Sequence, residues 1–170
     1  MTKRRNLTAF FVIGILGALG HFVYEWTGKP YVIGLFFPVN ESTWEHLKLL
    51  FYPTVLYFGA VYFLSNKKPK SFIPASVFSV FLGMLSIVVM FYTYQGIMGR
   101  NLDFLNILIY YLGVIVTIIT RQKLLEAEGI KSGFYTSISL ISLIIMIILF
   151  ATFSYNPPLL GIFTPPSLCS

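Results

Sequence analysis

The residues best suited to chemistry in this chain of 170 residues lie in two short polar clusters. The clusters contain both histidines and three of the six acidic residues, and their members are His21, Glu25, Asn40, Glu41, Ser42, Glu45 and His46. Imidazole and carboxylate groups bind zinc and other divalent ions, and carboxylates also orient imidazole ligands. The same groups can transfer protons or bind a cationic or hydroxylated small molecule. We therefore expect these residues to form a ligand-binding site.

Residue spacing narrows the candidates for metal ligation. His21 and Glu25 are four residues apart and would share one face of a helix. Together with Glu45 and His46 they are the candidate metal ligands, and a divalent ion such as zinc is the candidate cofactor. The sequence contains no H-E-x-x-H, no G-x-S-x-G and no glycine-rich phosphate-binding motif, so it assigns no catalytic residue.

These residues leave three functions open. The first, which we expect, is that the protein binds or carries a small ligand at this site. The second is a metal-dependent membrane enzyme that uses the same groups. In the third, the chain is a structural or accessory subunit of a membrane complex. Ser42 and Glu45 would then form a capping box at a helix start, and nearby basic residues would pair with the acids.

Two segments around these clusters resemble a known motif. They are His21–Trp26, which reads H-F-V-Y-E-W, and Pro38–Lys48, which reads P-V-N-E-S-T-W-E-H-L-K. The pair resembles a family of small bacterial polytopic membrane proteins of unknown function. The resemblance covers most of the chain. It implies a similar set of membrane spans and an important motif on the external side, and it implies no activity.

The composition indicates that these elements lie in lipid. Apolar residues make up 56% of the chain and charged residues only 11%, whereas soluble domains carry about 25% charged residues. An ionised side chain at the bilayer centre costs at least about 2.5–3.5 kcal/mol, which explains the scarcity of charge. The net charge of +6 comes from basic residues that flank apolar runs, so we expect no nucleic-acid partner.

Five apolar runs are long enough to cross a bilayer as helices. They span about residues 7–26, 43–64, 72–96, 102–120 and 133–155. We therefore predict an all-α fold, a single domain over residues 1–170 that forms a bundle of five transmembrane helices. The apolar part of the second run, Leu49–Leu64, is too short to cross alone. Its helix must begin near Ser42, which places the second polar cluster on its first turns, and we expect a bend near Pro53.

The distribution of basic residues predicts the orientation of the bundle. Nine of the twelve lysines and arginines precede the first run or lie in the two loops that follow the second and fourth runs. Basic residues accumulate on the cytoplasmic side of membrane proteins. We therefore expect a multi-pass protein of the cell membrane with a cytoplasmic N-terminus, both polar clusters at the external ends of the first two helices, and an external Cys169.

Further features are expected near the site or between helices. The apolar loop Tyr31–Phe37 should cover the site as a lid, and residues 156–170 should lie along the same surface. Tyrosines near the ends of the third and fourth helices approach the same external end, together with Asp103 and Asn106. These tyrosines belong to the membrane interface or line the pocket. Gly14 and Ala18 form a face of small residues that is typical of close helix packing and allows association of copies.

Overall fold

The computed structural model describes residues 3–66 and 68–166. The helices are α1 (Lys3–Trp26), α2 (Tyr31–Gly34), α3 (Thr43–Leu64), α4 (Phe72–Met98), α5 (Asp103–Glu126) and α6 (Gly133–Phe153), with 3-10 turns η1 (Glu128–Ile130) and η2 (Gly161–Phe163). Neither described range contains a strand. By length and composition, five of the helices, all except α2, can cross a membrane. The predicted all-α bundle with five spans is confirmed, and Cys169 lies outside the described residues.

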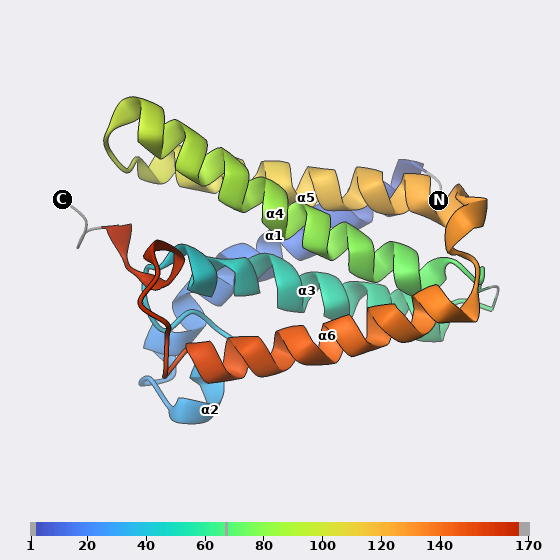
Figure 1. Cartoon of the computed structure of the whole chain (residues 1–170), viewed down its shortest axis with the longest axis horizontal. Coiled ribbons are helices and arrows are strands. Elements are labelled where there is room, and N and C mark those ends of the chain that lie inside the picture. Colours follow the sequence, from blue (N-terminus) through green and yellow to red (C-terminus); the bar gives the residue numbers. More distant parts are fainter. Residues whose placement is uncertain (1–2, 67, 167–170) are drawn as a thin grey trace.

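The five long helices run back and forth between two ends of the bundle (Figure 1). We call the end at which α1, α4 and α6 begin the lysine end, and the end at which α3 and α5 begin the histidine end. α4 contacts α3, α5 and α6, and α1 contacts α3 and α5. Over its most apolar stretch α4 is 56% buried, whereas α6 is only 17% buried. α4 is therefore the central helix, and α6 leaves most of its surface for lipid.

The start of α3 follows the sequence prediction in part. Ser42 is the N-cap, and its hydroxyl oxygen accepts a hydrogen bond from the backbone N–H of Glu45 at 3.4 Å. The second half of the expected capping box is absent. The Glu45 carboxylate accepts from the N–H of Val39 at 2.9 Å, and the N–H of Ser42 donates to the Asn40 side chain at 2.9 Å. Asn40 thus replaces Glu45 as the acceptor at the cap.

Small residues let α1 approach α3 and α5 closely. A Cβ added at Gly17 would lie 2.4 Å from the backbone oxygen of Leu49, and one added at Gly14 would lie 2.8 Å from the ring of Tyr111. The hydroxyl of Tyr110 donates to the carbonyl of Ile13 at 2.9 Å across the same contact. Gly14 therefore serves packing within the chain, and association of copies through this face stays a prediction.

A buried lysine connects α3 to α6 and to the loop before α3. Lys48 is 1% exposed, and its ammonium donates to Glu45 at 2.8 Å and to Ser154 at 2.5 Å. It also donates to the backbone carbonyls of Gly34 at 2.8 Å and Phe37 at 3.4 Å. A charge is tolerated in an apolar interior only when it is paired and hydrogen-bonded. This network holds the loop between α1 and α3 beside α6.

Candidate metal and ligand site

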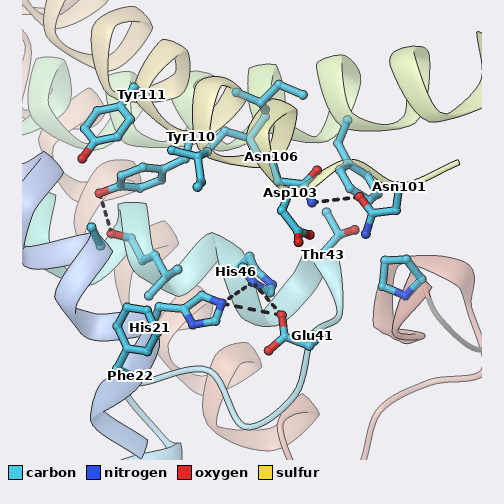
Figure 2. Close-up of a pocket in the computed structure, with 17 residues that line it drawn as sticks. His21, Phe22, Glu41, Thr43, His46, Asn101, Asp103, Asn106, Tyr110 and Tyr111 are labelled. Atoms are coloured by element: carbon cyan, nitrogen blue, oxygen red, sulfur yellow. Dashed lines mark hydrogen bonds and ion pairs between the residues drawn. The ribbon is translucent and has the colours of Figure 1, made fainter. Parts of the chain in front are cut away.

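Three side chains converge at the histidine end. The Nε2 atom of His21 on α1 lies 3.2 Å from the Nε2 atom of His46 on α3. The Oε2 atom of Glu41, in the loop before α3, lies 3.3 Å from His46 Nε2 and 3.6 Å from His21 Nε2. Figure 2 shows the three groups facing one another, and their ligand atoms all lie within 4.8 Å of one another. The arrangement is thus a triangle of potential ligand atoms.

The hydrogen bond at the other ring nitrogen of His46 decides what this triangle can accept. His46 Nδ1 lies 2.9 Å from the carbonyl oxygen of Ser42, so Nδ1 carries a proton and donates it. In the neutral ring, Nε2 then holds a lone pair that points at Glu41. Two acceptors therefore face each other, and His21 has one proton at most to offer from its Nε2. A shared proton or a cation must lie among these three atoms.

The distances fit a metal ion. In a tetrahedral zinc site with bonds of about 2.0–2.1 Å, neighbouring ligand atoms lie about 3.3–3.4 Å apart. The three separations of 3.2, 3.3 and 3.6 Å bracket this value. Histidine ligands commonly donate their second N–H to a carbonyl, as His46 does to Ser42. Two histidines and one carboxylate would occupy three of the four positions.

Glu41 is ionised in this arrangement. When the imidazoles carry the protons between them, hydrogen bonds from His21 and then from His46 hold the pKa of the Glu41 carboxyl well below its usual range. The side chain of Glu41 is 67% exposed, so solvent weakens its attraction to either imidazole. Glu41 is thus a charged ligand that reaches the histidines from the rim of the site.

The triangle opens onto a cavity of about 580 Å³ between α1, α3, α4 and α5. Its walls are mostly apolar, from residues such as Leu49, Ile87 and Phe91, and Pro166 of the C-terminal segment also contributes. The polar lining residues besides the triangle are Thr43, Asn101, Asp103, Asn106, Tyr110 and Tyr111. Tyr110 and Tyr111 thus line the pocket, one of the two positions that the sequence left open for the tyrosines, and Asp103 and Asn106 lie there with them. The cavity thus combines mostly apolar walls with a limited set of polar groups.

A second group of hydrogen bonds fixes the polar wall on α5. The hydroxyl of Tyr94 donates to Asn101 Oδ1 at 2.7 Å, and the side-chain amide of Asn106 donates to the same oxygen at 2.8 Å. In Figure 2, Asp103 points from α5 toward His46 on the opposite wall. The site therefore faces a carboxylate that is outside the triangle of ligand atoms.

Glu25 does not join the histidines. It pairs with Lys29 at 2.8 Å, and its side chain is 64% exposed. The turn after α1 takes a left-handed conformation at Gly28 and Lys29, with φ of 80° and 60°, which brings Lys29 back to Glu25. This hydrogen bond raises the pKa of Lys29. The expectation that Glu25 converges on the same pocket is therefore wrong.

Glu45 does not join the histidines either. It is 1% exposed and pairs with Lys48, on the side of α3 that faces the preceding loop and α6. Glu45 and His46 are neighbours in sequence, and successive residues of a helix point about 100° apart. Only one of the two can face α1. Asn40 and Ser42 lie at the cap of α3, where Asn40 accepts from Ser42 and the Ser42 carbonyl orients His46.

The loop Tyr31–Phe37 does not cover the cavity. None of its residues lines the cavity, and its first four residues form the short helix α2. The ring of Tyr31 stacks on that of Tyr155 with centroids 4.3 Å apart, and the hydroxyl of Tyr52 donates to the carbonyl of Leu35 at 3.1 Å. The C-terminal segment lies at the cavity instead, because Phe163 packs on Trp44 with centroids 5.0 Å apart and Pro166 reaches the cavity wall.

Comparison with known proteins identifies the family of this chain. Neither the curated proteins nor the solved structures include a match to the chain. The model of one family of unknown function matches residues 2–167, which is nearly the whole chain. The chain, whose structure has five apolar helices, therefore belongs by this match to the DUF6512 family, a family of unknown function.

Proposed function

We propose that this protein binds a divalent metal ion, zinc in the first place, at His21, Glu41 and His46, and that the ion helps to hold a small ligand in the adjoining cavity. The observation that carries the proposal is the triangle of ligand atoms, with sides of 3.2, 3.3 and 3.6 Å. The bond from His46 Nδ1 to Ser42 leaves Nε2 free to ligate. A proton shared among the same atoms is the competing explanation.

The cavity supports a ligand besides the metal. Small-molecule pockets occupy about 300–1,000 Å³, with mostly apolar walls and a few placed polar groups. The cavity of about 580 Å³ meets both conditions. Three protein ligands leave one position of a tetrahedral ion open. The ligand that fits has an apolar body and a head that binds metal, such as a carboxylate, hydroxyl or thiol.

The test of this proposal is metal binding by the purified full-length protein. After removal of metal with a chelator, zinc titration followed by calorimetry should give one site per chain. His21→Ala, His46→Ala and Glu41→Gln should each weaken binding by more than about 100-fold, since loss of even an outer-shell partner costs about 10–100-fold. Glu25→Gln is the matched control, because it removes an exposed carboxylate at the same end of the bundle that pairs with Lys29.

The controls separate a metal site from a hydrogen-bonded triangle. If the wild type takes up no zinc, or if Glu41→Gln and Glu25→Gln bind it equally, the triangle holds a proton and ties α1 to α3. Thermal unfolding of the three site variants would then show lower stability without any effect of added zinc. Ligand binding is followed separately, by the change in the visible spectrum of the cobalt-substituted protein on addition of short-chain carboxylates.

A metal-dependent membrane enzyme is the second candidate function. It is favoured by the open fourth position and by Asp103, a carboxylate that lines the same cavity outside the triangle. Catalytic zinc sites combine three protein ligands with a bound water, and a nearby carboxylate often serves as the general base. Asp103 would have that role. Its position on α5 makes it independent of the three proposed ligands.

A further inference from the structure

A second cavity lies at the lysine end of the bundle. It has a volume of about 490 Å³ and lies where α3 ends and where α4 and α6 begin. Its rim carries Lys68, Lys70 and Lys131. No acidic residue is among the described residues that line it. The cavity therefore concentrates positive charge at the end opposite to His21 and His46.

The three lysines are weakly neutralised by the protein. Lys131 pairs with Glu128, whose side chain is 86% exposed, and exposed pairs contribute little. The ammonium of Lys68 lies 4.3 Å from the centre of the Tyr62 ring, a contact that leaves its charge in place. Lys70 has no salt bridge to the described residues. An anion bound among them would relieve their mutual repulsion.

The backbone adds to this positive field. α6 begins at Gly133 in the cavity wall, and the side chain of its N-cap Ser132 forms no capping hydrogen bond. The first N–H groups of a helix have no partner within the helix, and they favour negative charge. In a helix of 21 residues this field is fully developed. The N–H groups of α6 supplement the lysines as donors to an anion.

Part of the lining and the surroundings of the cavity are apolar. Tyr62, Phe72 and Ile73 contribute apolar surface to its lining. Large apolar side chains beside it face outward, since Phe63 is 81% and Phe134 is 68% exposed. A soluble anion would gain nothing from these surfaces, whereas acyl chains would cover them. Basic pockets between transmembrane helices recognise lipid headgroups in this way.

We propose that this cavity binds the phosphate group of an anionic phospholipid, with the lysine rim and the start of α6 around the phosphate and the acyl chains against Phe63 and Phe134. The chemistry shared with a soluble ligand is the phosphate group, and the apolar surroundings select the lipid. The site is independent of the metal proposed at the histidine end. Failure of either proposal therefore leaves the other in place.

The test is lipid binding by the purified, delipidated full-length protein, followed by native mass spectrometry in detergent. Phosphatidylglycerol should bind at least about tenfold more tightly than zwitterionic phosphatidylcholine. The triple variant Lys68→Gln, Lys70→Gln, Lys131→Gln should lose this preference. The matched control Arg4→Gln, Arg5→Gln, Lys123→Gln removes the same charge from the lysine end outside the cavity and should retain it.

Three outcomes would overturn the proposal. The first is an equal loss in both triple variants, which would mean that net charge alone attracts the lipid. The second is equal binding of the two lipids by the wild type. The third is displacement of the lipid by inorganic phosphate at equal concentration, which would assign the site to free phosphate. If the first triple variant does not fold, the single change Lys70→Glu, at an exposed residue, replaces it.

Discussion

At the scale of single residues, His46 is central because its two ring nitrogens have different partners. Nδ1 donates to the carbonyl of Ser42 one turn earlier, and Nε2 faces His21 and Glu41. The first bond forms within the start of α3 and needs no tertiary contact. The imidazole is therefore oriented by its own helix and its cap, without a contact from α1. His21 and Glu41 then approach a nitrogen whose lone pair is already directed at them.

Lys48 provides a residue-scale prediction about stability. Lys48→Met should destabilise the protein by about 3–5 kcal/mol, because it leaves the Glu45 carboxylate buried without its cation. Adding Glu45→Gln should recover most of the loss, since the glutamine oxygen can still accept from the N–H of Val39. Unfolding by denaturant in detergent micelles, followed by circular dichroism, measures all the variants.

The exposed pair at the same end serves as the control for this prediction. Lys29→Met removes a lysine from an ion pair of the same length, 2.8 Å, in which both side chains are more than half exposed. Exposed pairs contribute about 0–1 kcal/mol. If Lys48→Met destabilised the protein no more than Lys29→Met, burial would not make the Lys48–Glu45 pair more stabilising than an exposed pair.

The sequence predicted which residues lie near the site better than it predicted which of their side chains face it. Both histidines and Glu41 belonged to the predicted ligand-binding set, and they converge. Glu25 and Glu45 belonged to the predicted metal ligands and lie elsewhere. Residue spacing fixes which side chains share a helix face, but the rotation of each helix is set by packing. The buried contact of Glu45 with Lys48 became visible only in the fold.

At the scale of elements, the bounds of the long helices follow from hydrophobicity and the contacts between them follow from small residues. The predicted start of α3 at Ser42 is confirmed, because a run of Leu49–Leu64 cannot cross a bilayer alone. α5 continues to Glu126, beyond the predicted end near residue 120, because its last turns are polar and extend past the apolar run. The prediction that the loop Tyr31–Phe37 covers the site was wrong. The loop is anchored elsewhere, because the ammonium of Lys48 donates hydrogen bonds to its backbone carbonyls.

The approach of α1 to α3 gives a prediction at this scale. Gly17→Ala should destabilise the protein by about 1–3 kcal/mol, because the new methyl group would lie 2.4 Å from the rigid backbone oxygen of Leu49. Gly59→Ala is the control inside α3, where a Cβ meets nothing within 4 Å. It should be neutral or stabilising by up to about 1 kcal/mol. Equal effects of the two changes, measured as shifts in thermal unfolding, would contradict close packing at Gly17.

At the scale of the whole molecule, the two ends of the bundle differ in chemistry. The histidine end has the imidazoles, Glu41 and a cavity with a polar wall, whereas the lysine end has a cavity with a basic rim. Because α1 crosses the bundle once before α3 begins, α1 and α3 start at opposite ends. If the basic residues set the orientation, the proposed metal site opens to the outside of the cell membrane and the proposed lipid site faces the cytoplasm.

Labelling of single cysteines tests this orientation. In a Cys169→Ser background, Lys29→Cys should react with a membrane-impermeant maleimide in intact cells, and Lys68→Cys should react only after lysis. The two positions are both exposed and lie at opposite ends of the bundle. Labelling of Lys68→Cys in intact cells with protection of Lys29→Cys would reverse the assignment.

The hydrogen bond between Lys48 and Ser154 also sets an order of events during biosynthesis. The two residues are 106 positions apart in sequence, and a ribosome makes the chain from its N-terminus. When α3 first leaves the translocon, its ammonium and the Glu45 carboxylate have each other and the preceding loop as partners, and Ser154 has not yet been made. Until α6 is made, the Lys48 ammonium therefore lacks one of its four acceptors, the hydroxyl of Ser154. The last span of the bundle thus completes the burial of a charge that entered with the second.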